Sequence, residues 1–241
     1  QDARYSGIAT LLTIHNLSYR GTFGNRVLEI AGIESFGFTY AERGGGHMVD
    51  LLGRGLNFAD ALNTVSEQYA REIQTPEFGE GMDELLVERS NRLLGILNGI
   101  DYDEQDPARD RHIAATFDVN HLDRRADNKL ALQHDVRLEP RPDVPLIGMV
   151  SRLADSKGLD LVAQALDWLL QQPLQLVVMG TGDQHYHDLL SAAAKRNRNL
   201  AVVPTFSTPL SQKIYAGSDM FLMPSRFEPC GLGQMIAMRY G

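Results

Sequence analysis

MPSRFEPCGLGQ, residues 223–234, is the most informative segment of this 241-residue chain. It follows a short apolar run at 219–223, which predicts a buried parallel strand. A helix is expected next, over 231–240. A strand, a tight turn and a helix place backbone N–H groups and the positive helix end at the carboxyl edge of a sheet, where open α/β sheets bind anions. Glu228 lies in this turn, where a carboxylate is unfavourable unless it holds hydroxyl groups or balances a developing positive charge.

The same order of strand, loop and helix recurs through the second half of the chain. Such alternation is typical of an α/β fold with a parallel sheet. The strands are expected at 146–150, 174–179 and 200–204, followed respectively by a helix from 159, a helix ending at 195 and a short helix at 210–216.

Two cations, Arg152 and Lys157, lie on the loop between the first of these strands and its helix. Cations at a helix N-terminus oppose the macrodipole at a cost of about 0.3–1 kcal/mol. An anionic ligand between them would reverse that cost, since charge-assisted hydrogen bonds contribute about 1.5–3 kcal/mol each. A diphosphate is the expected occupant, and two solvated surface cations are the alternative.

Two glycines, Gly180 and Gly182, follow the strand at 174–179 and are expected to let the backbone approach a ligand closely. Their motif, GTGD, is not the GxGxxG of dinucleotide-binding proteins, and the acid expected about 20 residues later is missing.

The first half of the chain also delivers polar side chains at the ends of apolar strands. The run at 9–16 ends in His15 and Asn16, and the run at 93–97 is followed by Asn98. An amide at a strand end can hydrogen-bond a sugar. For His15 the alternative is a core-edge histidine bonded to a backbone carbonyl.

Between these runs, local patterns predict further elements. A helix is expected at 47–58, a strand at 61–65, and a helix at 67–73 capped by Ser66. The glycine run 44–46 is expected to be a flexible turn, because the GxxxxGK[ST] pattern of a phosphate loop is absent.

Three prolines within 139–145 predict the domain boundary. The first domain is expected at 1–139, the linker at 140–145 and the second domain at 146–241. Residues 102–128 show no clear period and are expected to form an excursion at the domain edge.

Composition narrows the function classes. The net charge of −8 argues against nucleic acid or an anionic membrane as a partner, and no apolar run approaches the ~20 residues of a membrane span. The single cysteine fits a reducing compartment. No metal site is expected, because the histidines are scattered and the acids at 77, 80 and 83 fit a solvated face.

Five motifs resemble the bacterial glycogen synthases and plant starch synthases, in that family's order. The segment PSRFEPCGLGQ (224–234) is similar to their donor-sugar loop. The others are TIHNLSYRG (13–21), NTVSEQYAREIQTPEFG (63–79), LNGID (97–101) and VSRLADSKGLDL (150–161).

The resemblance implies a GT-B fold, in which two Rossmann-like domains face a cleft. It implies a retaining enzyme that moves glucose from ADP-glucose to the non-reducing end of an α-1,4-glucan, without a cofactor. The cytoplasm of a bacterium or the plastid stroma would be its location, and its oligomeric state stays open. Because the chain starts at Gln1 and stops at Gly241, both domains are expected to be incomplete, so that this fragment alone is inactive or weak.

The resemblance also implies roles for particular residues. Arg152 and Lys157 would hold the diphosphate, while Glu228 and His15 would act at the glucose. The expected donor contacts are Asn16, Asn98, Gly180, Gly182, Phe206, Cys230, Gly231 and Leu232. Phe206 would stack on adenine, and the alternative for it is a core aromatic. The broader family pattern has a second glutamate where this chain has Ile236, so front-face attack is the working hypothesis rather than a covalent intermediate.

Two alternatives to this function stay open. One is a related GT-B enzyme that uses a UDP- or GDP-sugar, since the residues alone do not fix the base. The other is a glucan-binding module without catalysis.

Overall fold

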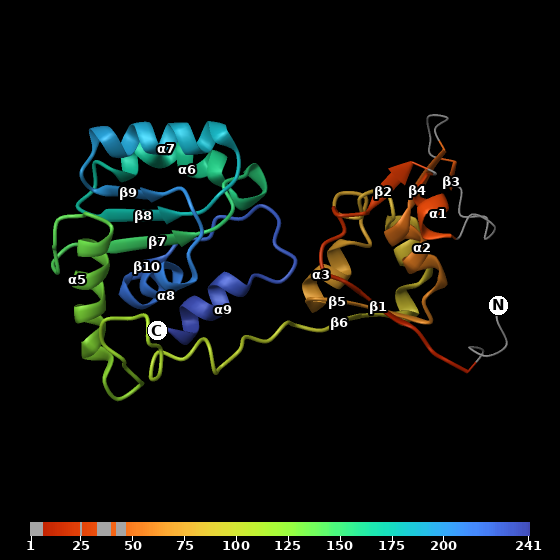
Figure 1. The fold of residues 1–241 in the computed structure, drawn as a ribbon, viewed down its shortest axis with the longest axis horizontal. Coiled ribbons are helices and arrows are strands. Elements are labelled where there is room, and N and C mark those ends of the chain that lie inside the picture. Colours follow the sequence, from red (N-terminus) through yellow and green to blue (C-terminus); the bar gives the residue numbers. More distant parts are fainter. Residues whose placement is uncertain (1–6, 25, 33–39, 42–46) are drawn as a thin grey trace. The chain divides into compact units, whose positions relative to one another are not determined.

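The computed structural model describes residues 7–24, 26–32, 40–41 and 47–241 (Figure 1). The glycine run 44–46 lies outside the described residues. The chain forms two compact units, Gln1–Asn98 and Gly99–Gly241, and each is described by itself.

The second unit is built on a parallel sheet with the strand order β10-β7-β8-β9. The strands are β7 (Leu146–Val150), β8 (Gln175–Met179), β9 (Leu200–Val203) and β10 (Met220–Phe221). Every residue of β8 is buried, as a central strand covered on both faces requires. The strand expected at 146–150 is confirmed in full, whereas the one expected at 219–223 is shorter.

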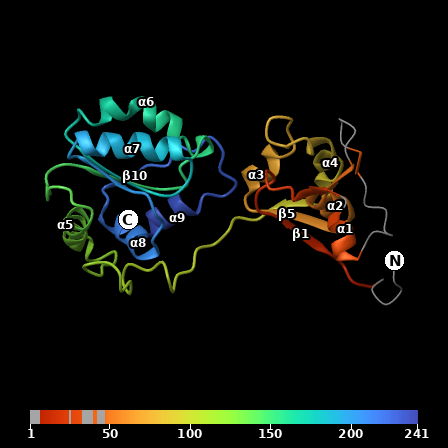
Figure 2. The same cartoon turned by 45° about the horizontal axis from the view of Figure 1, so that its top comes forward.

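Helices cover both faces of this sheet (Figures 1 and 2). Alternate residues of β8 point to opposite sides: Leu176 and Val178 pack in one apolar cluster, Val177 and Met179 in another. The first cluster includes residues of α6 (Leu159–Leu169) and α7 (Gln184–Arg196), and the second includes residues of α5 (Arg125–Asp135) and α8 (Thr208–Gly217). The last helix is α9 (Leu232–Arg239).

The strand order creates a switch point between β7 and β10. From β7 the chain proceeds through β8 to β9, and it then returns to place β10 on the other side of β7. The loops that follow β7 and β10 therefore lead to helices on opposite faces of the sheet (Figure 1). Open α/β sheets bind their ligands at such a point.

The boundary between the units falls after Asn98, not in the linker predicted at 140–145. Helix α5 packs against α8, and Lys129 Nζ hydrogen-bonds the carbonyl oxygen of Val144 (2.7 Å) and pairs with Asp219 Oδ2 (2.7 Å). The prolines thus mark a break in regular structure within the second unit, because the residues before them are already packed on its sheet.

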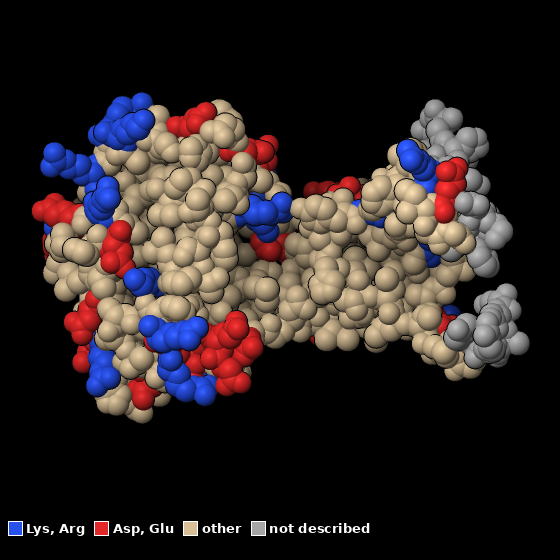
Figure 3. Space-filling model, viewed as in Figure 1, with Lys and Arg blue, Asp and Glu red and all other residues tan. Residues whose placement is uncertain are grey.

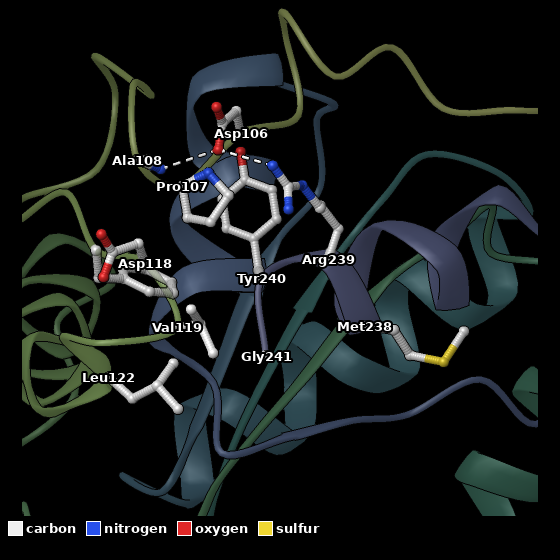
Figure 4. Close-up of a pocket in the computed structure, with 11 residues that line it drawn as sticks. Asp106, Pro107, Ala108, Asp118, Val119, Leu122, Met238, Arg239, Tyr240 and Gly241 are labelled. Atoms are coloured by element: carbon white, nitrogen blue, oxygen red, sulfur yellow. Dashed lines mark hydrogen bonds and ion pairs between the residues drawn. The ribbon is translucent and has the colours of Figure 1, made fainter.

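The segment from Gly99 to the start of α5 contains one short 3₁₀ turn, η4 (Leu122–Arg124), and is fastened to α8 and α9 by side chains. Asp110 Oδ2 accepts a hydrogen bond from the hydroxyl of Tyr240 (2.6 Å), and Asp106 Oδ1 pairs with Arg239 Nη2 (2.9 Å). Figure 4 shows Arg239 and Tyr240 beside Asp106, at a pocket of about 500 Å³. None of the predicted site residues lines this pocket.

The first unit contains a parallel sheet in the order β1-β5-β6, made of β1 (Leu11–Ile14), β5 (Ala61–Thr64) and β6 (Leu93–Gly95). A small antiparallel sheet joins β2 (Thr22–Gly24), β4 (His47–Asp50) and β3 (Tyr40–Ala41). The helices are α1 (Arg26–Ala31), α2 (Leu51–Phe58), α3 (Glu67–Glu72) and α4 (Asp83–Glu88), and η3 (Ser90–Arg92) precedes β6.

One local prediction in this unit is wrong and another is confirmed. The helix expected at 47–58 begins only at Leu51, because Asp50 caps it by accepting a hydrogen bond from the amide of Gly53 (2.8 Å). Residues 47–50 instead form β4. Ser66 caps α3 as expected, and its hydroxyl accepts from the amide of Tyr69 (2.9 Å). Among the described residues, no helix has both the length and the apolar character to cross a membrane.

Replacement of Tyr240 by phenylalanine tests how the 99–124 segment is held. Burial raises the pKa of the Tyr240 hydroxyl, and its bond to Asp110 raises it further, so the hydroxyl remains a donor at neutral pH. Tyr240→Phe leaves a buried carboxylate oxygen without this donor, and we expect a loss of about 1–3 kcal/mol of stability. Urea unfolding followed by circular dichroism measures it, with Tyr102→Phe at a 62% exposed position as the control. Equal midpoints for Tyr240→Phe and the wild type would refute the anchoring role.

Candidate functional site

The loop after β7 carries the first part of the site. It leads through a short 3₁₀ turn, η5 (Asp155–Lys157), to Gly158, which has φ of 72° and begins α6. A Cβ atom on Gly158 would lie 2.1 Å from the carbonyl oxygen of Pro224. Glycine is therefore needed here both for the left-handed backbone and for the approach of the loop that follows β10.

The loop after β10 carries the second part, and it lies against the first. The amides of Arg226 and Phe227 both donate to the carbonyl oxygen of Ser156, at 3.0 and 3.3 Å. These bonds bring Glu228 over the end of η5. The two loops at the switch point of the sheet are thus in direct backbone contact.

Lys157 and Glu228 meet at this contact. Lys157 Nζ lies 2.6 Å from Glu228 Oε2, and the side chains are 16% and 25% exposed. The hydroxyl of Ser225 donates to the same carboxylate oxygen (3.1 Å). An ammonium group has three N–H donors and a carboxylate has two acceptor oxygens, so both groups can bind a ligand while they remain paired. Both residues were expected at the site, but their direct pairing and the contact from Ser225 were not predicted.

Arg152 is exposed on the loop after β7, the loop that also carries Lys157. Arg152 and Lys157 thus place two cations on one loop of a net-acidic chain, and Glu228 balances the charge of Lys157. Figure 3 shows basic and acidic side chains interspersed on the visible face of the second unit. No extended basic surface is visible on this face among the described residues.

Gly180 and Gly182 have a packing role that was not predicted, and their contact with a ligand stays a prediction. A Cβ atom at Gly180 would lie 1.7 Å from the carbonyl oxygen of Ser151, and one at Gly182 would lie 2.2 Å from that of Leu153. The backbone of the loop after β7 thus packs against the Cβ side of both glycines. Glycine is required at both positions by this packing, which fixes the start of the loop that carries Lys157.

The remaining predicted residues of the second unit lie on two loops. Cys230, Gly231 and Leu232 continue from Glu228 into the start of α9, where Gly231 has φ of 80°. Phe206 follows β9 and is 62% exposed, so it is not a core aromatic. An exposed ring at the carboxyl edge of the sheet can stack on a planar ligand.

In the first unit, His15 and Asn16 follow β1, and Asn98 comes after β6. Because β1 and β6 flank β5 in a parallel sheet, these residues share one edge. His15 is exposed, which does not favour the core-edge alternative. The amide of Leu17 donates to the buried hydroxyl of Tyr69 (2.9 Å), a support for this loop that no sequence signal indicated.

The described residues contain no group of three or more His, Cys, Asp or Glu side chains arranged to hold a metal ion.

Comparisons with known proteins agree with the predicted family. The family model described as "Starch synthase catalytic domain" matches residues 1–88, and the one described as "Glycosyl transferases group 1" matches 144–241. The glycogen synthase of Moorella thermoacetica is 50% identical over 98% of this chain and 49% of the relative. That of Kosmotoga olearia is 49% identical over 96% of this chain and 49% of the relative.

A solved structure extends the agreement to the fold. The catalytic domain of Starch Synthase IV from Arabidopsis thaliana, bound to ADP and acarbose, superposes with a TM-score of 0.89 at 33% identity. The match covers 95% of this chain and 48% of that one, and it confirms the predicted α/β fold of GT-B type. The chain spans about half the length of the curated relatives it matches. By these matches, the chain belongs to the glycogen synthase and starch synthase family of glycosyltransferases.

Proposed function

We propose that the protein containing this chain is a retaining glucosyltransferase that transfers glucose from ADP-glucose to the non-reducing end of an α-1,4-glucan. The observation that carries the proposal is the Lys157–Glu228 pair, held between the loops that follow β7 and β10. The names of the relatives support a glucan product, and the ADP in the starch synthase structure supports the adenine nucleotide. We propose no cofactor besides the donor; a bacterial cytoplasmic or plastid location stays a prediction.

The cations would act on the leaving group. When the bond between glucose C1 and the diphosphate oxygen breaks, negative charge develops on the diphosphate. Lys157 is fixed by Glu228 before any donor arrives, so its ammonium needs little reorganisation to stabilise that charge. Arg152, on the same loop, would add a second cation. The amides of Cys230, Gly231 and Leu232 are proposed to complete the contacts.

Glu228 would act on the sugar. Its carboxylate can accept hydrogen bonds from glucose hydroxyls and balance the positive charge of an oxocarbenium-like transition state. Double displacement in glycosidases uses two carboxyl groups about 5–5.5 Å apart. Ile236, which packs against an apolar cluster, occupies the position of the second glutamate in the family pattern. We therefore propose front-face attack, in which the acceptor hydroxyl gives its proton to the departing phosphate oxygen.

The other predicted residues would complete the donor site. Phe206 would stack on adenine, and His15, Asn16 and Asn98 would bind the glucose from the first unit. These roles are proposals that rest on the family resemblance and on the place of each residue at a strand end.

Incorporation of [¹⁴C]glucose into glycogen by the full-length protein tests the function. We expect incorporation from ADP-glucose and much less from UDP-glucose. Incorporation from UDP-glucose alone would instead identify a related enzyme of the same fold. Glycogen binding without incorporation from any donor would identify a glucan-binding module and overturn the proposal.

Lys157→Ala should lower kcat by about 10²–10³, because one fixed donor to the leaving group is lost. The control is Lys195→Ala at an exposed position near the end of α7. Thermal unfolding should show that both variants remain folded. Wild-type turnover by folded Lys157→Ala would remove the diphosphate role.

Glu228→Gln should lower kcat by about 10² or more while the KM for ADP-glucose changes little, because charge balance matters most in the transition state. Glu139→Gln, at an exposed position, controls for the loss of one carboxylate. Steady-state kinetics with varied donor separate the two parameters. If KM rises and kcat is kept, Glu228 serves donor binding only.

A further inference from the structure

A second ion pair joins the loop after β10 to the first turn of α6 and has no part in the proposed chemistry. Arg226, on the loop after β10, directs its guanidinium to Asp160 in the first turn of α6. Its Nη2 lies 2.5 Å from Asp160 Oδ2, and its Nε lies 3.3 Å from Asp160 Oδ1. Two roughly parallel bonds fix a guanidinium and a carboxylate in orientation as well as in distance.

The Arg226–Asp160 pair lies next to the Lys157–Glu228 pair in sequence, on both of the segments that meet here. Asp160 follows Lys157 by three residues, and Arg226 precedes Glu228 by two residues on the same loop. The amide of Arg226 also donates to the carbonyl oxygen of Ser156 (3.0 Å). The Arg226–Asp160 pair and this backbone bond thus both act on the loop segment that leads to Glu228.

The loop that carries Lys157 is itself anchored from another direction. Tyr186, a buried residue of α7, donates its hydroxyl to Asp155. This bond, with burial, raises the pKa of Tyr186 to about 12, so the hydroxyl remains a donor at neutral pH. The loop after β7 is thus fixed to the core of the second unit, and Arg226 holds the loop after β10 against it.

The Arg226–Asp160 pair is too exposed to contribute much to global stability. The Arg226 side chain is 53% exposed and that of Asp160 is 26% exposed, and surface pairs of this kind have small effects on unfolding. The pair is expected to matter more for local opening of the loop than for global unfolding, because irregular loops open more easily than the core and depend on a few contacts. Loss of the pair should therefore loosen the loop while the fold remains.

We propose that Arg226 and Asp160 are positioning residues that set the placement of Glu228 against Lys157. The proposal rests on the proposed function, since it concerns the rate of that transfer. The alternative is that Arg226 binds the donor directly, in which case Asp160 has no part of its own.

Kinetics of the full-length protein separate these possibilities. Misplacement of a reacting group by about 1 Å can lower the reaction rate about 10²-fold. Arg226→Gln and Asp160→Asn should therefore each lower kcat about tenfold to a hundredfold. The KM for ADP-glucose should change less than about threefold. The matched control is Arg141→Gln, since Arg141 makes the same two kinds of bond to Asp143 (3.1 and 2.9 Å) on the surface at 139–145. It should behave as the wild type.

Exchange of the two charges gives a test that a direct donor contact would fail. The kcat of the double variant Arg226→Asp/Asp160→Arg should be at least about tenfold higher than that of Arg226→Asp, because an ion pair of opposite direction is restored. Unchanged kcat in Asp160→Asn, or no recovery in the double variant, would overturn the proposal.

Hydrogen exchange provides a readout that does not need activity. In Asp160→Asn the peptide 224–230 keeps its own sequence, and the amides of Arg226 and Phe227 should exchange about tenfold or more faster, with the thermal midpoint unchanged. Unaltered exchange would overturn the positioning role. If the wild type transfers no glucose from any donor, the proposed function fails, and this experiment still decides whether the pair holds the loop.

Discussion

An ion pair, Lys157–Glu228, connects two loops that the sheet sends toward opposite faces. Its partners are 71 residues apart in the chain and both are largely buried, so either charge alone would be costly. Together they are compensated before a ligand arrives. This is the condition for preorganised electrostatics: the charges are already in place when the leaving group and the sugar develop charges of their own.

Much of the second unit can be understood as support for these loops. The buried strand β8 fixes the position of β7 beside it, and Gly180 and Gly182 receive the backbone of Ser151 and Leu153 at the start of the loop. Gly158 lets Pro224 approach from the other side. The glycines of the site therefore admit protein backbone, and this packing holds the two loops together.

The local patterns in the sequence predicted those features that depend on interactions between neighbouring residues. The strand at 146–150 and the Ser66 cap are as expected, because burial period and capping chemistry are properties of neighbouring residues. The helix predicted at 47–58 was misplaced at its start because the cap of Asp50 was not recognised. The division after Asn98 could not be predicted from composition, since it depends on the packing of α5 against α8. Likewise, Lys157 and Glu228 were each identified, but their pairing depends on β10 lying next to β7.

A crystal structure of the full-length protein with ADP tests the central claim most directly. The account predicts that a phosphate oxygen lies about 3 Å from Lys157 Nζ, with the Glu228 carboxylate facing the space next to the terminal phosphate. A diphosphate bound away from the loops that follow β7 and β10, with Lys157 making no contact to it, would contradict the account.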